Sequence, residues 1–388
     1  MTDMTLIDAI AARAGELTEW RRDFHAHPEL GFEEHRTSGI VAGLLEGWGI
    51  ETHRGIGGTG VVGVIEGRGP GRSVGLRADM DALPIEERTN KPWSSKTPGV
   101  MHACGHDGHT TMLLGAARWL AETRDFPGRV VVIFQPAEEG LGGARAMIAD
   151  GLFERFPVDE IYGLHNSPYT DPGVVSVKPG VAMAGADFFD ITLRGTGSHA
   201  ASPQHAADPV VAMAQLVQAL QTVMSRNAPP SEAAVLSVTK VRAGDAYNVI
   251  PGEAVISGTM RFFDDGWRDR MRARLETISK GVAAANDMEV EVVIKPVFTP
   301  LENDEALSLG FAELARGVVG DDLVRVTTDK VTGSEDFADM LRAVPGAYFT
   351  VGHKGDVPLH NPGFDLDDDM LPLGASLLAK VAVARLEG

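Results

Sequence analysis

The spacing of apolar residues changes character several times along the chain. From Asp8 to Leu45 apolar residues recur at helical spacing, with an interruption at His27-Pro28, where proline removes a backbone donor; we expect two helices with a break. Short β-branched runs then predict strands at 60–65, 73–77, 129–135, 160–164 and 174–177, with helices between some of them at 110–121 and 143–150. This alternation predicts an α/β domain with a mixed, mostly parallel sheet flanked by helices.

Around Ala186 the pattern becomes that of a different domain. Strands are predicted at 188–194, 234–241, 254–262 and 289–295, and helices at 208–226 and 266–285. Their order, βαββαβ, is that of a self-contained α+β unit. After Pro300 helices and strands alternate again through 304–318, 337–343, 348–351 and 370–386. We therefore predict one domain from residues 1–185 and 297–388, with residues 186–296 inserted into it.

Length indicates the number of domains, and charge limits the classes of binding partner. A chain of 388 residues is long for one hydrophobic core, which supports two domains. Its 35 basic and 54 acidic residues give a net charge of −19, which would repel nucleic acid and an anionic membrane surface. One cysteine cannot form an internal disulfide, residues 1–16 lack the layout of a signal peptide, and no apolar run approaches membrane-spanning length. We expect a cytoplasmic protein with neither nucleic acid nor membrane as a partner.

Candidate metal ligands cluster at predicted strand ends and turns. The segment His102-Ala-Cys-Gly-His-Asp107 holds the only cysteine, and His109 follows it. The candidate ligands, including those on other turns, are Cys104, His106, Glu139, His165 and His360. Such mixed sulfur, nitrogen and oxygen donors suit zinc, manganese, cobalt or nickel better than calcium or magnesium.

Five candidate ligands suggest two metal ions and hydrolytic chemistry. A thiolate from Cys104 could bridge two cations, and metals about 3.5 to 4 Å apart can hold a water and polarise a carbonyl together. In the adjacent pair Glu138-Glu139 we assign Glu139 as a ligand and Glu138 as the general base, because a carboxylate that is not a ligand can take the proton of the water and pass it to a leaving amine.

Each candidate also has a purely structural interpretation. A lone cysteine is often a small core residue, a histidine at a strand end is often a satisfied polar group, and adjacent glutamates usually form a solvated face. Their joint occurrence favours a metal site. Two other readings remain open: Cys104 as a nucleophile paired with His102, His106 or His109, and a non-catalytic binding protein on the same fold.

Nine segments in order along the chain resemble those of a known family. They are HAHPELGFEE (25–34), GLRADMDALPIEE (75–87), MHACGHDGHT (101–110), FQPAEEG (134–140), GLHN (163–166), HAASP (199–203), NVIP (248–251), GSEDF (333–337) and LHNP (359–362). The chain resembles the metal-dependent amidohydrolases that include hippurate hydrolase, indole-acetyl-amino-acid hydrolases and N-acyl-amino-acid deacylases, relatives of aminoacylase. The resemblance implies a dinuclear metallopeptidase-like catalytic domain that hydrolyses the linear amide of a small N-acyl amino acid.

The resemblance also implies roles for particular residues. Cys104, His106, Glu139, His165 and His360 would hold two divalent metal ions, manganese or zinc in the first place and cobalt or nickel as further options, and Glu138 would be the base. The segment from Ala186 to Pro296 would be a lid that also forms a homodimer or a higher homo-oligomer.

On the lid, His199 would stabilise the oxyanion, often across the dimer, and Asn248 would contact the substrate. Arg261, with Asn248, is a candidate for binding the substrate carboxylate. Asp81 would orient a ligand histidine by a hydrogen bond, and the same role is a weaker expectation for Asp79.

Three features leave finer questions open. Glu335 and Asp336 either line the site or cap the helix that follows Ser334. Ser202, where many relatives carry methionine, and Asp171, where relatives carry an aromatic-containing segment, would make the neighbourhood of the pocket more polar. The acyl preference therefore stays open.

Overall fold

The computed structural model describes residues 3–388, which divide into two compact units. The first unit runs to Ala182 and resumes at Leu301–Lys330 and Glu335–Gly388; the second comprises Met183–Pro300 and Val331–Ser334. The sequence pattern had placed residues 331–334 with the first domain. They belong to the second because Met183 and Val331 form a parallel bridge and the Ala184 amide donates to the Val331 carbonyl at 3.0 Å.

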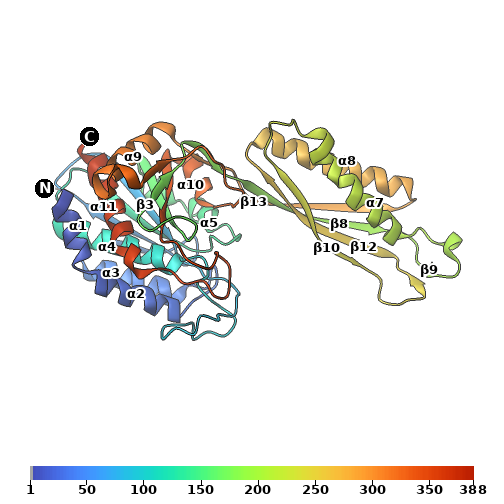
Figure 1. Ribbon diagram of the computed structural model, residues 1–388, viewed down its shortest axis with the longest axis horizontal. Coiled ribbons are helices and arrows are strands. Elements are labelled where there is room, and N and C mark those ends of the chain that lie inside the picture. The colour runs from blue at the N-terminus through green and yellow to red at the C-terminus, as the bar shows by residue number, and fades with distance from the viewer. Residues whose placement is uncertain (1–2) are drawn as a thin grey trace. The chain divides into compact units, whose positions relative to one another are not determined.

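A mixed sheet forms the centre of the first unit (Figure 1). Among the described residues it has eight strands in the order β1-β2-β4-β3-β5-β16-β6-β15. The strands are β1 (Glu51–Ile56), β2 (Gly60–Glu66), β3 (Ser73–Asp79), β4 (Arg129–Gln135), β5 (Glu160–Ser167), β6 (Val175–Val177), β15 (Val324–Val326) and β16 (Gly346–Gly352). The central strands β4, β3, β5 and β16 are mutually parallel, whereas β1, β2 and β6 pair antiparallel with their neighbours β2, β4 and β16. The predicted mostly parallel α/β sheet is confirmed.

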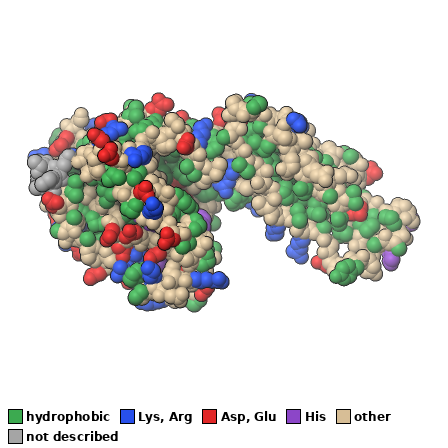
Figure 2. Space-filling view, in the orientation of Figure 1, with side chains coloured by type: hydrophobic (Ala, Val, Ile, Leu, Met, Phe, Trp, Pro, Cys, Tyr) green, Lys and Arg blue, Asp and Glu red, His purple; other side chains and the backbone are tan. Residues whose placement is uncertain are grey.

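Helices pack on this sheet in two groups. The first group is α1 (Asp3–Ala11), α2 (Ala14–Ala26), α3 (His35–Gly47), α4 (His106–Thr123), α9 (Glu305–Val319) and α11 (Leu371–Glu387). In this group α4 contacts both α2 and α11. Because α1 contacts α11, the two ends of the described chain lie close together. The second group is α5 (Gly143–Ala149), the short α6 (Leu152–Arg155) and α10 (Phe337–Ala343), in which α5 contacts α10. The break at His27-Pro28 lies where it was predicted, but a further break near Ala12 makes three helices of the expected two. Figure 2 shows acidic and basic side chains interspersed on the visible face of this unit.

The second unit is a four-stranded antiparallel sheet in the order β10-β12-β8-β13, with two helices on one face (Figure 1). The elements are β8 (Gly185–Arg194), α7 (Pro209–Thr222), β10 (Val235–Ala243), β12 (Glu253–Phe262), α8 (Asp265–Ala285) and β13 (Glu289–Phe298), which is the predicted βαββαβ order. Leu216 from α7 and Trp267 and Met271 from α8 fill the core against the sheet. Two-residue strands β9 (Ser198–His199) and β11 (Val249–Ile250) pair antiparallel outside it.

The smaller elements β7 (Gly180–Met183) and β14 (Leu301–Asn303) pair with each other. No helix within residues 3–388 combines the length and the apolar character needed to cross a lipid bilayer.

Candidate metal centre

The candidate ligands lie on loops at the carboxyl ends of the parallel strands. Strands β4, β3, β5 and β16 are adjacent and run in one direction, so the segments that follow them meet at one edge of the sheet. Ligands of open α/β sheets bind at this edge. It is here that the chain places Glu139 after β4, Cys104 and His106 after β3, His165 near the end of β5 and His360 in the loop after β16.

The loop that carries Cys104 turns sharply into α4. Gly105 has a φ of +95° and His106 is the first residue of the helix. A Cβ atom at Gly105 would lie 2.2 Å from Asn166 Nδ2, so only glycine fits at this turn. The His360 amide donates to the Ala103 carbonyl at 2.8 Å, which ties the loop after β16 to the same turn.

The five predicted donors form two groups that share one residue. Donor atoms of Cys104, His106 and His165 lie within 4.8 Å of one another, and so do those of Cys104, Glu139 and His360. Cys104 Sγ is 3.4 Å from His165 Nε2, and His360 Nε2 is 3.1 Å from Glu139 Oε1. The arrangement offers three donors to each of two cations, with the sulfur of Cys104 in both sets.

Hydrogen bonds on the far side of the imidazole rings leave the inner nitrogens free. His106 Nδ1 donates to the carbonyl of Asp81 at 2.9 Å and lies 3.2 Å from Asp81 Oδ1. His165 Nδ1 donates to the Asn166 carbonyl at 2.6 Å, so Nε2 of the neutral ring carries a free lone pair, and this atom faces Cys104. Among the described residues the buried His106 Nε2 has no hydrogen-bond partner. A buried nitrogen without a partner, beside a thiol and a second imidazole, is what a zinc- or manganese-type ion requires, so the donor set fits such a metal.

Burial and neighbouring charges shift the pKa values of these donors. Burial and the nearby Glu139 carboxylate raise the pKa of the Cys104 thiol. Hydrogen bonds from His360 to Cys104 and Glu139 raise the pKa of His360 to about 10. Burial, together with the charge of His109, lowers the pKa of His165 well below its usual range. Burial lowers the pKa of His106, but the charges of Asp79 and Cys104 outweigh burial and raise that pKa well above its usual range. At neutral pH His165 is therefore ready to bind a cation, whereas Cys104, His106 and His360 must first release protons.

Glu138 lies beside these donors in a cluster of buried carboxyl groups. Oxygen atoms of Glu138, Glu335 and Asp336 lie within 4.8 Å of one another. Burial and the charges of Glu335, Glu139 and Asp336 raise the pKa of Glu138 well above its usual range. A carboxyl group with this environment holds a proton more tightly than one in water, as a group that both takes and returns a proton must.

Arg77 supplies the positive charge within this cluster. Its guanidinium donates to Asp79 at 2.8 Å, to Glu335 at 2.9 Å and to Asp336 at 3.2 Å. Glu335 Oε1 also accepts the Phe337 amide at 2.9 Å, so Glu335 both lies beside Glu138 and caps the start of α10. Asp336 makes no side-chain cap to α10; its oxygens accept instead from Gln135 and from the Ala144 amide.

A second network, which the sequence did not predict, lies behind the donors. Asn166 Nδ2 donates to the Cys104 carbonyl at 2.6 Å, and Asn166 Oδ1 accepts from His353 Nε2 at 3.0 Å. His109 Nδ1 donates to Asp79 Oδ1 at 2.7 Å while its Nε2 accepts the Asn166 amide at 3.0 Å. Asp79 thus contacts His109, and its oxygen stays 3.9 Å from His106 Nδ1. The available signals were a charged residue at the end of a strand, Asp79, and an asparagine directly after a predicted ligand, Asn166.

The remaining predicted residues lie in the second unit. His199, in β9, and Asn248, directly before β11, are exposed, and the Ala200 amide donates to the Asn248 carbonyl at 3.0 Å. The Ala201 amide donates to His199 Nδ1 at 3.1 Å, so the proton of the neutral ring is on Nε2. Arg261 donates to Ser334 Oγ at 2.6 Å.

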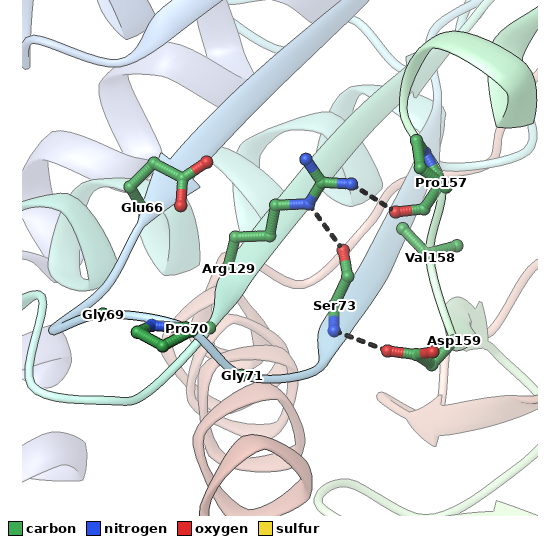
Figure 3. A pocket seen from close by; sticks show the side chains of 10 residues that line it. Glu66, Gly69, Pro70, Gly71, Ser73, Arg129, Pro157, Val158 and Asp159 are labelled. Carbon is green, nitrogen blue, oxygen red and sulfur yellow. Dashed lines mark hydrogen bonds between the residues drawn. The ribbon is translucent and has the colours of Figure 1, made fainter.

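A hollow of about 420 Å³ lies at the opposite edge of the first unit's sheet, near the amino ends of β3 and β4 (Figure 3). Its polar groups bind one another: Arg129 donates to Ser73 Oγ and the Pro157 carbonyl, and the Ser73 amide donates to Asp159. It contains none of the predicted donors.

Comparison with known proteins agrees with this fold and site. The model of Peptidase family M20/M25/M40 matches residues 75–384. The chain is 42% identical over 387 residues to hippurate hydrolase of Campylobacter jejuni, covering 99% of this chain and 100% of that protein. It is 40% identical to IAA-amino acid hydrolase ILR1-like 4 of Arabidopsis thaliana, covering 97% of this chain and 88% of that protein.

A solved structure gives the same result for the fold. The crystal structure of a Bacillus subtilis protein, described as a dinuclear metal-binding peptidase of the M20 family, superimposes with a TM-score of 0.84 at 35% identity, covering 97% of this chain and 99% of that one. The fold and the similarities define a metallopeptidase-like hydrolase. The chain belongs to Peptidase family M20/M25/M40.

Proposed function

We propose that this protein is a metal-dependent amidohydrolase that cleaves the amide bond of an N-acyl amino acid, giving a free amino acid and a carboxylic acid. The observation that carries the proposal is the pair of donor groups that share Cys104. Relatives named for hippurate and for IAA-amino acid conjugates support the substrate class, since both substrates are N-acyl amino acids.

Five residues would hold two divalent ions at this site. Cys104 is shared between a group with His106 and His165 and a group with Glu139 and His360. Manganese or zinc suits these donors best, with cobalt and nickel as further options. When bound, two such ions polarise a carbonyl and lower the pKa of a water. Asp81 fixes the ring of His106 through its Nδ1 and accepts the Glu139 amide, so that it orients ligands of both groups.

Glu138 is the general base in this proposal. It takes a proton from the attacking water and returns that proton to the departing amino group. The buried carboxylates around Glu138 favour its protonated form, while the positive charge of bound ions favours the ionised form. Because these two influences oppose each other, Glu138 can both accept a proton from the water and release it to the departing amino group.

Residues of the second unit would bind the substrate. His199 would stabilise the developing oxyanion, because the Ala201 amide occupies Nδ1 and leaves Nε2–H as a donor. Asn248 and Arg261 would bind the substrate carboxylate.

We further propose that the second unit is a lid that also forms a homodimer or a higher homo-oligomer. We also propose that the protein works in the cytoplasm without nucleic-acid or membrane partners. The exposed Val235 and Val241 on the edge strand β10 support pairing of subunits there.

The acyl group is the finer question. Asp171 pairs with Lys354 at 2.7 Å, and this pairing offsets its charge, so Asp171 by itself does not argue for a basic substrate. Ser202, in the second unit, is the other departure from the family pattern and the one we propose bears on the acyl preference.

A thiol amidase is the alternative reaction class, and the state of Cys104 argues against it. Nucleophilic thiols have lowered pKa values and partial exposure. Here burial and Glu139 raise the pKa of Cys104, and the thiol is 7% exposed. A non-catalytic role is also disfavoured, because all five donors and Glu138 are retained in one cluster.

One experiment tests the reaction class, the substrate and the metal together. The protein is stripped with chelator and assayed on benzoyl-glycine, acetyl-amino acids and indole-acetyl-amino acids after manganese, zinc, cobalt or nickel is returned. We expect turnover to stop in chelator and to recover with metal on at least one of these substrates. Turnover that continues in chelator would show a thiol enzyme, and no turnover with any metal would exclude the proposed substrate class.

A further inference from the structure

The turn that carries Glu138 has a strained backbone. Ala137, directly before Glu138, has a φ of +54°, a left-handed conformation that residues other than glycine seldom adopt. Ala137 and Glu138 are both buried. Such a conformation persists only where surrounding contacts hold it, and strained residues of this kind occur at functional sites.

Two buried carboxylates bind the backbone amides on either side of Glu138. The Ala137 amide donates to Glu34 Oε1 at 2.9 Å, and the Glu139 amide donates to Asp81 Oδ2 at 3.0 Å. The other oxygen of Glu34 accepts the hydroxyl of Thr59, so the carboxyl group is held from two directions. Glu34 is fully buried. It also stands directly before α3, where its carbonyl accepts the Ser38 amide at 2.9 Å.

Glu34 belongs to the segment HAHPELGFEE, to which neither the donor groups nor Glu138 belong. The same segment packs directly on the turn. A Cβ atom at Gly31 would lie 3.0 Å from Ala137 Cα and 2.8 Å from Leu141 Cδ1, so there is no room for even a methyl group. A hydrogen bond from Glu34 and close packing by Gly31 therefore act on the same residue, Ala137.

We propose that Glu34 is a positioning residue for the base: by holding the Ala137 amide it keeps the turn in the left-handed conformation that sets the direction of the Glu138 side chain. This inference rests on the proposed function of Glu138. Glu34 touches neither the donor atoms of the two groups nor the reacting atoms, so its removal is expected to lower kcat without removing metal.

The test compares E34A with E34Q and with E33A, in which the neighbouring exposed glutamate is removed. With metal content matched, E34A is expected to lower kcat by about 10- to 100-fold, because small misplacements of a catalytic group cost that much, while KM stays near the wild-type value. E34Q keeps an oxygen that accepts the Ala137 amide and is expected to recover most of the loss. Equal kcat values for E34A and E33A would overturn the proposal, as would a loss of metal from E34A that accounts for its lower activity.

A second pair of variants covers the case in which E34A does not fold. Gly31 has no left-handed φ, so G31A adds a methyl group against Ala137 without straining its own backbone. G39A, in α3, adds one where no atom lies within 4 Å. We expect G31A to lower kcat and G39A to leave it unchanged; equal values for the two would overturn the proposal.

A readout without metal or substrate separates this inference from the proposed function. Amide hydrogen exchange of the peptide around residues 135–140 in metal-free protein is expected to be faster in E34A than in E33A. Equal exchange would overturn the role of Glu34. Because this measurement needs no turnover, it decides the point even if the wild-type protein hydrolyses no N-acyl amino acid, a result that would overturn the proposed function alone.

Discussion

The two units differ in what they bury. Among the described residues, the first unit buries many ionisable side chains, including Arg77, Asp79, His109 and Glu335, whereas the second buries one charged group, Asp187, which pairs with Arg268 and Arg272. The residues proposed for substrate binding in the second unit, His199 and Asn248, are exposed. An uncompensated buried charge is costly, so such groups are retained in the first unit only where each has a partner or a cation to bind.

The two units also hold their functional side chains in different ways. In the first unit, the rings of His106 and His165 are held from behind by hydrogen bonds to Asp81 and to the Asn166 carbonyl. In the second unit, a short strand pair presents His199 with one backbone hydrogen bond. Substitutions in the first unit should therefore change proton transfer or metal binding, and with them the dependence of activity on pH, whereas those in the second unit should leave metal content unchanged.

The largest expected effect is at Glu138. E138Q keeps the size of the side chain and removes its ability to take a proton, so kcat should fall by about 100- to 10,000-fold while metal content stays at the wild-type level. Steady-state kinetics and elemental analysis of the same samples measure both quantities. E154Q, at an exposed glutamate of α6, is the matched control. Near-normal turnover of E138Q at full metal content would remove Glu138 as the base.

The second prediction concerns the exposed residues of the other unit. H199A should lower kcat by about 100- to 1,000-fold, the usual cost of one oxyanion donor, with no change in metal content. H205A removes an exposed histidine six positions later in the chain and should have no effect. If H199A instead loses metal, the separation between the two units drawn above is wrong.

The third prediction is that metal binding depends on pH, because some of the proposed ligands must lose a proton before they bind a cation. Because the pKa values of Cys104 and His106 are raised and that of His360 is about 10, all three hold protons at neutral pH, and cations must displace them. Affinity should therefore rise with pH, by up to about 1,000-fold per pH unit for three displaced protons. Competition with a metal indicator at several pH values measures this slope.

The variant C104A sharpens that test. It should lower metal occupancy, since Cys104 belongs to both donor groups, and it should reduce the slope to about 100-fold per pH unit because the displaced protons of His106 and His360 remain. Two full equivalents of metal in C104A, with the wild-type slope, would show that Cys104 is not a ligand.

Sequence patterns identified the proposed ligands as candidates, but not the residues that support them. Cys104 and His106 stand close together in the chain, and Glu139 and His165 follow apolar strands, so local spacing was sufficient to select these four as candidates. Asn166 and Glu34 act through hydrogen bonds to Cys104 and Ala137, 62 and 103 positions away. Such contacts depend on how distant segments pack, which local periodicity does not determine.

The same limit applies to the fold. The buried strands β3 and β4 were predicted from short β-branched runs. The edge strand β1, with the sequence Glu-Thr-His-Arg-Gly-Ile, has no apolar alternation and forms because β2 offers it an antiparallel partner. The three-residue strand β15 likewise exists through its pairing with β6.

The smallest predicted effect is on stability, and it comes from a buried pair in the first unit. Burial lowers the pKa of His25, but the hydrogen bond and the charge of Asp107, 2.8 Å away, outweigh burial and raise it to about 9. A histidine pKa raised on folding adds stability that is complete below its unfolded pKa of about 6.5 and is lost as pH rises through 9. The free energy of unfolding should therefore fall between pH 6.5 and 9 by at most about 1.4 kcal/mol per pH unit from this group.

Denaturant unfolding of metal-free protein across this range measures that slope. H25Q should flatten it, whereas H27Q, at the half-buried histidine two positions later, should keep it. An unchanged slope in H25Q would show that the charge on His25 does not contribute to stability.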